Sequence, residues 1–96
     1  MTDKDKYYQK EQYIIGRKIA DEVVLVPIRD NVAELNRSWV LNDIGGYIWN
    51  LIDGRRDAGQ MRDAITKEFG ITPKRAEKDL VYFLRQLERL NLIRRI

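Results

Sequence analysis

The stretch from Ser38 to Gly54 constrains the fold most, because it passes from a strand pattern to a helix pattern without a linker. Trp39 and Leu41 share one strand face. Asn42 suits the N-cap position, since its side-chain oxygen can accept hydrogen bonds from the first helical turn. The apolar residues that follow have the i, i+4, i+7, i+8 spacing of a core-facing helix: Ile44, Ile48, Leu51 and Ile52. Strands are therefore predicted before this stretch and helices after it.

Two more strands are predicted upstream, at residues 13–19 and 23–28. The second is β-branched and almost continuously apolar, which indicates burial on both faces. Pro27 lacks a ladder donor and therefore suits a sheet edge or a strand end. Residues 29–36 are interpreted as a turn and a connection to the third strand at 37–41. The three strands predict a small antiparallel sheet.

Two more helices are predicted downstream. Asp57 and Gln60 have the spacing of a capping box before an apolar stripe over residues 58–69. Thr72-Pro73 has the N-cap and first-turn residues of a third helix that runs to about Leu90. The fold class predicted is α+β, with a three-stranded antiparallel sheet followed by three helices.

The first residues differ in character from the rest. Residues 1–12 are polar and charged, and Tyr7 and Tyr8 supply the apolar bulk among them. Segments of this composition fray unless they are tied down. We therefore predict a flexible N-terminal tail over residues 1–12 and one domain over residues 13–96.

Composition narrows the function. The chain has 96 residues, a net charge of +3, and neither His nor Cys. The usual general base near neutral pH and all thiol chemistry are therefore missing, so we expect a protein that is not an enzyme and binds no cofactor or metal. No apolar run reaches membrane-spanning length and the N-terminus lacks the apolar core of a secretory signal, which predicts a cytoplasmic protein. The small core also permits a homodimer.

The third predicted helix has two different faces at 100° per residue. One is a core stripe of Ala76, Leu80, Phe83, Leu84, Leu87 and Leu90. The opposite face carries Lys74, Lys78, Val81, Tyr82, Arg85 and Arg89. Three interpretations stay open for this basic face: a solvated surface, a groove for an acidic or amphipathic peptide, and the recognition helix of a DNA-binding winged-helix regulator. DNA is disfavoured, because the net charge is only mildly positive and the face offers few side chains that read bases.

The third strand bears on the same choice. A small open sheet leaves backbone donors and acceptors unpaired at its edges, and an extended peptide can add itself there. If the third helix lies alongside this edge, backbone lines one side of a groove and the basic face lines the other.

The residues that carry a family resemblance span most of the chain. They are Leu41-Asn42, Ile48-Trp49, Leu51-Ile52-Asp53-Gly54, Asp79, Phe83-Leu84, Leu87 and Asn91-Leu92-Ile93. In this pattern, over about residues 14–95, the chain resembles the PqqD-like family, the RiPP precursor peptide recognition elements. The resemblance implies a winged helix-turn-helix-like fold and a binding activity without catalysis. The ligand would be the leader of a ribosomally synthesised precursor peptide, and the partner a modifying enzyme such as a radical SAM protein.

The resemblance also implies which residues bind. The leader would add as a strand between the third strand and the third helix. Trp49 is then expected in the core, and Asn91 stands where a small helix-ending residue is usual. The peptide-binding residues implied are Ser38, Trp39, Val40, Leu41, Lys78, Val81, Tyr82, Arg85 and Arg89.

Overall fold

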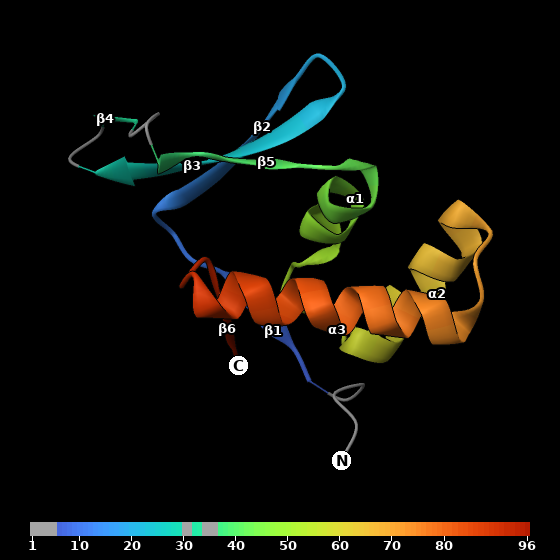
Figure 1. The fold of residues 1–96 in the computed structure, drawn as a ribbon. Coiled ribbons are helices and arrows are strands. Elements are labelled where there is room, and N and C mark those ends of the chain that lie inside the picture. Colours follow the sequence, from blue (N-terminus) through green and yellow to red (C-terminus); the bar gives the residue numbers. More distant parts are fainter. Residues whose placement is uncertain (1–5, 30–31, 34–36) are drawn as a thin grey trace.

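The structure is a computed structural model that describes residues 6–29, 32–33 and 37–96 (Figure 1). It combines six strands with three helices in the described part of the chain. In chain order the elements are β1 (Tyr8–Lys10), β2 (Ile14–Ile19), β3 (Glu22–Arg29), β4 (Val32–Ala33), β5 (Trp39–Leu41), α1 (Asp43–Leu51), α2 (Ala58–Phe69), α3 (Pro73–Arg89) and β6 (Ile93–Arg95). The predicted α+β class with an antiparallel sheet and three helices is confirmed.

The main sheet has four strands, so the prediction of a three-stranded sheet is corrected. β3 pairs with β2, β4 and β5, and every pairing is antiparallel. The added strand, β4, is two residues long and pairs Ala33 with Ile28 at the end of β3. It lies in the segment that the sequence predicted as a connection, where a two-residue strand leaves no periodic signal to find.

Residues 8–10 differ from the expected flexible tail, because they form β1, which pairs with β6 in a second, two-stranded sheet. Tyr8 is 2% exposed and belongs to the main core. The first and last strands therefore lie side by side near the end of α3 (Figure 1). The sequence could not predict this pairing, because three polar-flanked residues gain order only from a partner about 85 residues away. Residues 1–5 of the predicted tail lie outside the described residues.

The helix ends follow the predicted capping residues. The Asn42 side chain accepts from the Gly45 N–H at 2.8 Å. Asp57 and Gln60 form both bonds of a capping box. Thr72 caps α3, and Pro73 is in its first turn. These local signals fixed the starts of all three helices.

The core is formed by the main sheet, all three helices, β1 and β6. Trp49 is buried, as predicted, and packs so close to β2 that a Cβ on Gly16 would lie 2.5 Å from its Nε1. The core stripe predicted on α3 is confirmed at Ala76, Leu80, Leu84 and Leu87, which are all buried, whereas Leu90 is exposed at the C-cap. Trp49 therefore packs α1 against the main sheet. The basic face of α3 is not part of the core and lies on the surface.

Candidate functional site

β5 has a free edge. β3 pairs with β2 along residues 22–27, and β5 pairs with Val23–Leu25 of the same strand. Because a strand has two edges, β5 must lie on the edge of β3 opposite to β2. Within the described part of the chain, no strand pairs with the outer edge of β5. This edge offers backbone groups to a guest strand.

The backbone direction at this edge follows from the register. The Ile28 N–H donates to the Tyr13 C=O at 2.7 Å, toward β2. In an antiparallel ladder the bonded residues alternate, so Val24 also points its backbone groups to β2, and its neighbours point theirs to β5. Val40 lies opposite Val24. Its N–H and C=O therefore face away from β3, onto the free edge.

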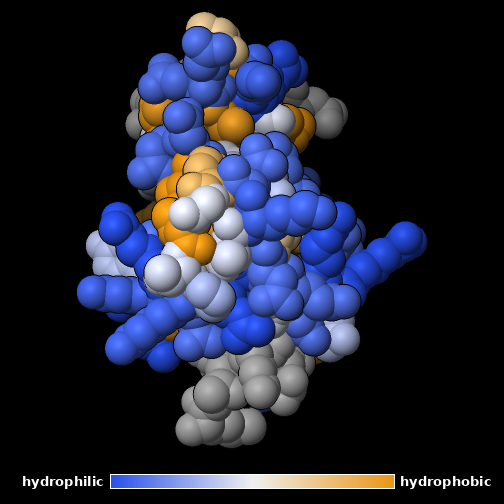
Figure 2. Space-filling model, turned by 90° about the vertical axis from the view of Figure 1, so that its right-hand side faces the viewer, coloured by the Kyte–Doolittle hydropathy of each residue, from blue (hydrophilic) through white to orange (hydrophobic). Residues whose placement is uncertain are grey.

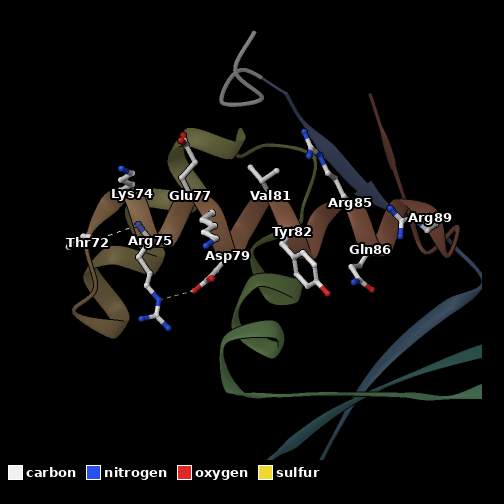
Figure 3. Close-up of a pocket in the computed structure, with 11 residues that line it drawn as sticks. Thr72, Lys74, Arg75, Glu77, Asp79, Val81, Tyr82, Arg85, Gln86 and Arg89 are labelled. Atoms are coloured by element: carbon white, nitrogen blue, oxygen red, sulfur yellow. Dashed lines mark hydrogen bonds and ion pairs between the residues drawn. The ribbon is translucent and has the colours of Figure 1, made fainter.

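The outer face of α3 forms a shallow depression. All five α3 residues that the resemblance implied line it: Lys78, Val81, Tyr82, Arg85 and Arg89. Tyr82 is 67% exposed, an unusual position for a large aromatic side chain. Figure 3 shows the long cationic side chains spread along the helix, with Tyr82 between them. The sequence therefore identified one continuous surface on α3.

The acidic side chains of α3 form ion pairs in the described part of the chain, whereas some of its cationic side chains do not. Its acidic residues each have a cationic partner: Glu77 with Arg62 at 3.5 Å, Asp79 with Arg75 at 3.7 Å, and Glu88 with Arg95 at 3.2 Å. Among the residues that the structure describes, no ion pair forms at three of the α3 cations, namely Lys74, Lys78 and Arg89. The surface therefore carries positive charge that no ion pair among the described residues neutralises.

A second depression, of about 480 Å³, joins β5 to the end of α3. Trp39 lies on its sheet side and Leu90 on its helix side. The hydroxyl of Tyr13, which lines this depression, donates to the Asn91 C=O. Apolar and aromatic side chains line it together with two arginines: Tyr13, Ile14, Pro27, Ile28, Arg29, Arg37, Trp39, Leu90 and Leu92. Trp39 of β5 and Leu90 at the end of α3 therefore line the same depression.

The four strand residues of the predicted site do not lie in the α3 depression. Trp39 is in the second depression, and Leu41 lines a third one with Ile44 and Phe69 where β5 enters α1. Figure 2 faces the α2 side of the molecule, where a small apolar patch is surrounded by hydrophilic residues. Ser38 and Val40 are exposed. The predicted residues thus occupy neighbouring surfaces rather than one pocket.

Several residues that line these depressions were not among the predicted site residues, and Gln86 and Leu90 are two of them. Gln86 lines the α3 depression, and in Figure 3 it points with Tyr82 to the side of the helix where β5 runs, whereas Val81 points to the other side. Leu90 was assigned to the core. A helical wheel places Gln86 next to Tyr82 on α3, so the sequence could have identified it. Leu90 is exposed because it is the C-cap residue, where α3 ends.

The ionisable groups with shifted pKa values lie elsewhere. The pKa of Lys10 is lowered by burial, against the opposing charge of Asp53, and its Nζ lies 4.9 Å from the Trp49 ring centre. The pKa of Asp53 is lowered, chiefly by the hydrogen bond from the Arg55 N–H. Across residues 6–29, 32–33 and 37–96, no group of three acidic, His or Cys side chains is placed to hold a metal ion. None of the described helices is long and apolar enough to cross a membrane.

The comparisons with known proteins point in one direction. Among solved structures, the chain is similar to "TbiB1 in Complex with the TbiA(beta) Leader Peptide", with a TM-score of 0.72 and 27% identity, over 88% of this chain and 93% of that one. No curated protein sequence matches the chain. Residues 22–93 match the family described as "Coenzyme PQQ synthesis protein D (PqqD)". The family expected from the residues is thereby confirmed, and the chain belongs to the PqqD family.

Proposed function

We propose that this protein is a RiPP recognition element, which binds the leader of a ribosomally synthesised precursor peptide as a strand added to β5. The leader pairs with the free backbone edge around Val40 and contacts the α3 face around Tyr82. The protein contributes no chemistry of its own, and presents the precursor in the cytoplasm to a modifying enzyme such as a radical SAM protein.

One observation supports the proposal: Trp39 of β5, the strand whose outer edge is unpaired in the described part of the chain, lines the same depression as Leu90 at the C-terminal end of α3. In Figure 1, β5 and α3 extend along nearly the same axis with opposite chain directions, and α1 is joined to the far end of β5. A strand added to β5 would therefore run along α3 rather than across it. Backbone bonds at the edge give affinity, and side-chain contacts to α3 give specificity.

The similar solved structure supports the proposal, because TbiB1 is described in complex with a leader peptide. In the proposed domain the sheet and three helices form a winged helix-turn-helix-like unit that binds peptide instead of DNA.

A homodimer formed through the free edge of β5 would compete with the leader. Binding is therefore measured at concentrations where light scattering gives the mass of the monomer.

The test removes one backbone donor. In Val40→Pro the outward N–H at the free edge is lost, while the bonds between Trp39, Leu41 and β3 stay, since Pro is tolerated on the open side of an edge strand. The control, Val40→Thr, keeps the N–H and the β-branched side chain. We expect Val40→Pro to weaken leader binding about three- to tenfold, the effect of losing one net hydrogen bond of about 0.5–1.5 kcal/mol.

The ligands are fluorescent leader peptides from short precursor genes next to the gene for this protein, measured by anisotropy. Circular dichroism checks that both variants fold. Equal binding by Val40→Pro and Val40→Thr would contradict strand addition at β5. Failure of every neighbouring leader to bind, together with tight and steeply salt-dependent binding of duplex DNA, would favour the regulator instead.

A further inference from the structure

The unpaired cations of α3 form a line along the surface. Lys74 and Lys78 are one turn apart, and Arg89 lies near the C-terminal end of the helix. The outer depression of α3 includes all three side chains. Tyr82 lies between them and is open to solvent. The line therefore combines an exposed aromatic ring with three positive charges that form no ion pair within residues 6–29, 32–33 and 37–96.

An ordinary solvated helix face looks different. Such a face is commonly held by i, i+4 ion pairs, which is what Arg75 and Asp79 form on this helix. The acids Glu77 and Glu88 are also occupied, by Arg62 of α2 and Arg95 of β6. Because the acids of α3 are all paired, nothing nearby on the helix compensates the three remaining cations. An external group of negative charge fits this surface best.

The spacing of the cations sets a pattern for the ligand. Lys74 and Lys78 are separated by four helical residues, or about 6 Å along the axis. Two residues of an extended strand cover nearly the same distance, at about 3.3 Å per residue. Lys78 and Arg89 are about 16 Å apart by the same rule, which is about five residues of strand.

We propose that the ligand segment lying along α3 is acidic, with Asp or Glu at positions i and i+2 opposite Lys74 and Lys78 and a third acid four to six residues away, opposite Arg89. This inference rests on the proposed function and names the class of leader that the site selects. Each exposed charge pair contributes modestly, but three pairs in one line discriminate between acidic and neutral leaders and speed association.

The test needs no knowledge of the natural leader. A bacterial-display library of random 12-residue peptides is sorted against the full-length protein and against the variant Lys74→Glu/Lys78→Glu/Arg89→Glu. We expect the unmodified protein to enrich peptides with acids at the stated spacing. The charge-reversed variant should enrich Lys or Arg at the same positions.

A matched control separates local from overall charge. The variant Arg17→Glu/Lys18→Glu/Lys67→Glu changes the net charge equally, at exposed positions of β2 and α2 that do not line the α3 depression. An enriched acidic peptide should bind the α3 variant at least about tenfold more weakly. It should bind the control within about twofold of the unmodified protein. Circular dichroism confirms that both variants are folded.

The outcomes distinguish the two proposals. Enriched peptides that lose affinity with Val40→Pro, but show no acidic positions, would overturn the acidic preference and leave strand addition standing. Enriched peptides that bind Val40→Pro as well as Val40→Thr would overturn strand addition itself. A library with no enriched peptide at any round would contradict both.

Discussion

At the scale of single residues, Asp53 shows how a short polar pattern acts in the folded chain. Its Oδ1 accepts from the N–H groups of Arg55 at 2.8 Å and Arg56 at 3.0 Å, and its Oδ2 accepts from Arg56 Nη1 at 2.8 Å. Asp53-Gly54 has the residues typical of a helix end, because Gly suits the left-handed position that follows a helix. In the structure the C-cap is Ile52, and Gly54 has the positive φ of 77° that the turn requires.

A pH dependence follows from Asp53. Its pKa in the folded protein is lowered, first by the bond from the Arg55 N–H, so its ionised form favours folding. This contribution is complete above the ordinary pKa of 3.8 and is lost as the pH falls through the lower folded value. We expect Asp53→Asn to reduce the fall of the melting temperature below pH 4, measured by circular dichroism from pH 7 to pH 2. An unchanged acid profile would assign the acid sensitivity to other carboxylates.

At the scale of elements, β2 and α1 meet at Gly16. A Cβ there would lie 2.5 Å from Trp49 Nε1 and 3.1 Å from Trp49 Cδ1, closer than packed side chains allow. The strand can approach the helix only because residue 16 has no side chain. The sequence predicts a strand that contains Gly16 and a core position for Trp49, but no sequence pattern indicates that these two residues contact each other.

Gly16→Ala should therefore destabilise the protein by about 1–3 kcal/mol, the usual cost of overpacking a core. Urea unfolding followed by Trp fluorescence and circular dichroism measures the change. The double variant Gly16→Ala/Trp49→Phe tests the cause, because the smaller ring removes the atoms that the new Cβ meets. The two substitutions should cost less together than the sum of their separate costs. Strict additivity would mean that the Gly16 effect comes from the strand backbone and not from Trp49.

At the scale of the whole molecule, the two ends of the described chain lie side by side and are joined by hydrogen bonds. β1 pairs with β6, the Ile96 N–H donates to the Tyr7 C=O at 3.1 Å, and the Ala58 N–H donates to the Lys6 C=O at 3.1 Å. Residues 6–10 therefore link the end of α3 to the start of α2. This places β1 within the cooperative fold.

The two neighbouring tyrosines test this role. Tyr8 is 2% exposed and Tyr7 is 38% exposed. Tyr8→Ala should destabilise the protein by about 3–5 kcal/mol, as expected for a large aromatic residue removed from a core, whereas Tyr7→Ala should change stability by less than about 1 kcal/mol. Urea unfolding of both variants gives the comparison. Equal and small changes in the free energy of unfolding of both variants would indicate that β1 is a frayed segment.

The sequence by itself determined the elements that local chemistry controls. The caps at Asn42, Asp57 and Thr72 and the apolar stripe of α3 are local patterns, because each depends on residues within one or two helical turns. The basic face around Lys78 and Tyr82 could be predicted for the same reason, because the helical period determines which residues share one face of a helix.

The tertiary structure decided everything that depends on distant partners. It alone paired Tyr8 with Arg95 across the two ends, brought Gly16 against Trp49, and left the outer edge of β5 at Val40 unpaired within the described residues. It also determined which cations of α3 keep a free charge, because Glu77 and Glu88 find their partners on α2 and β6. Long-range contacts have no periodic signature, since they depend on which surfaces the packed elements present to one another.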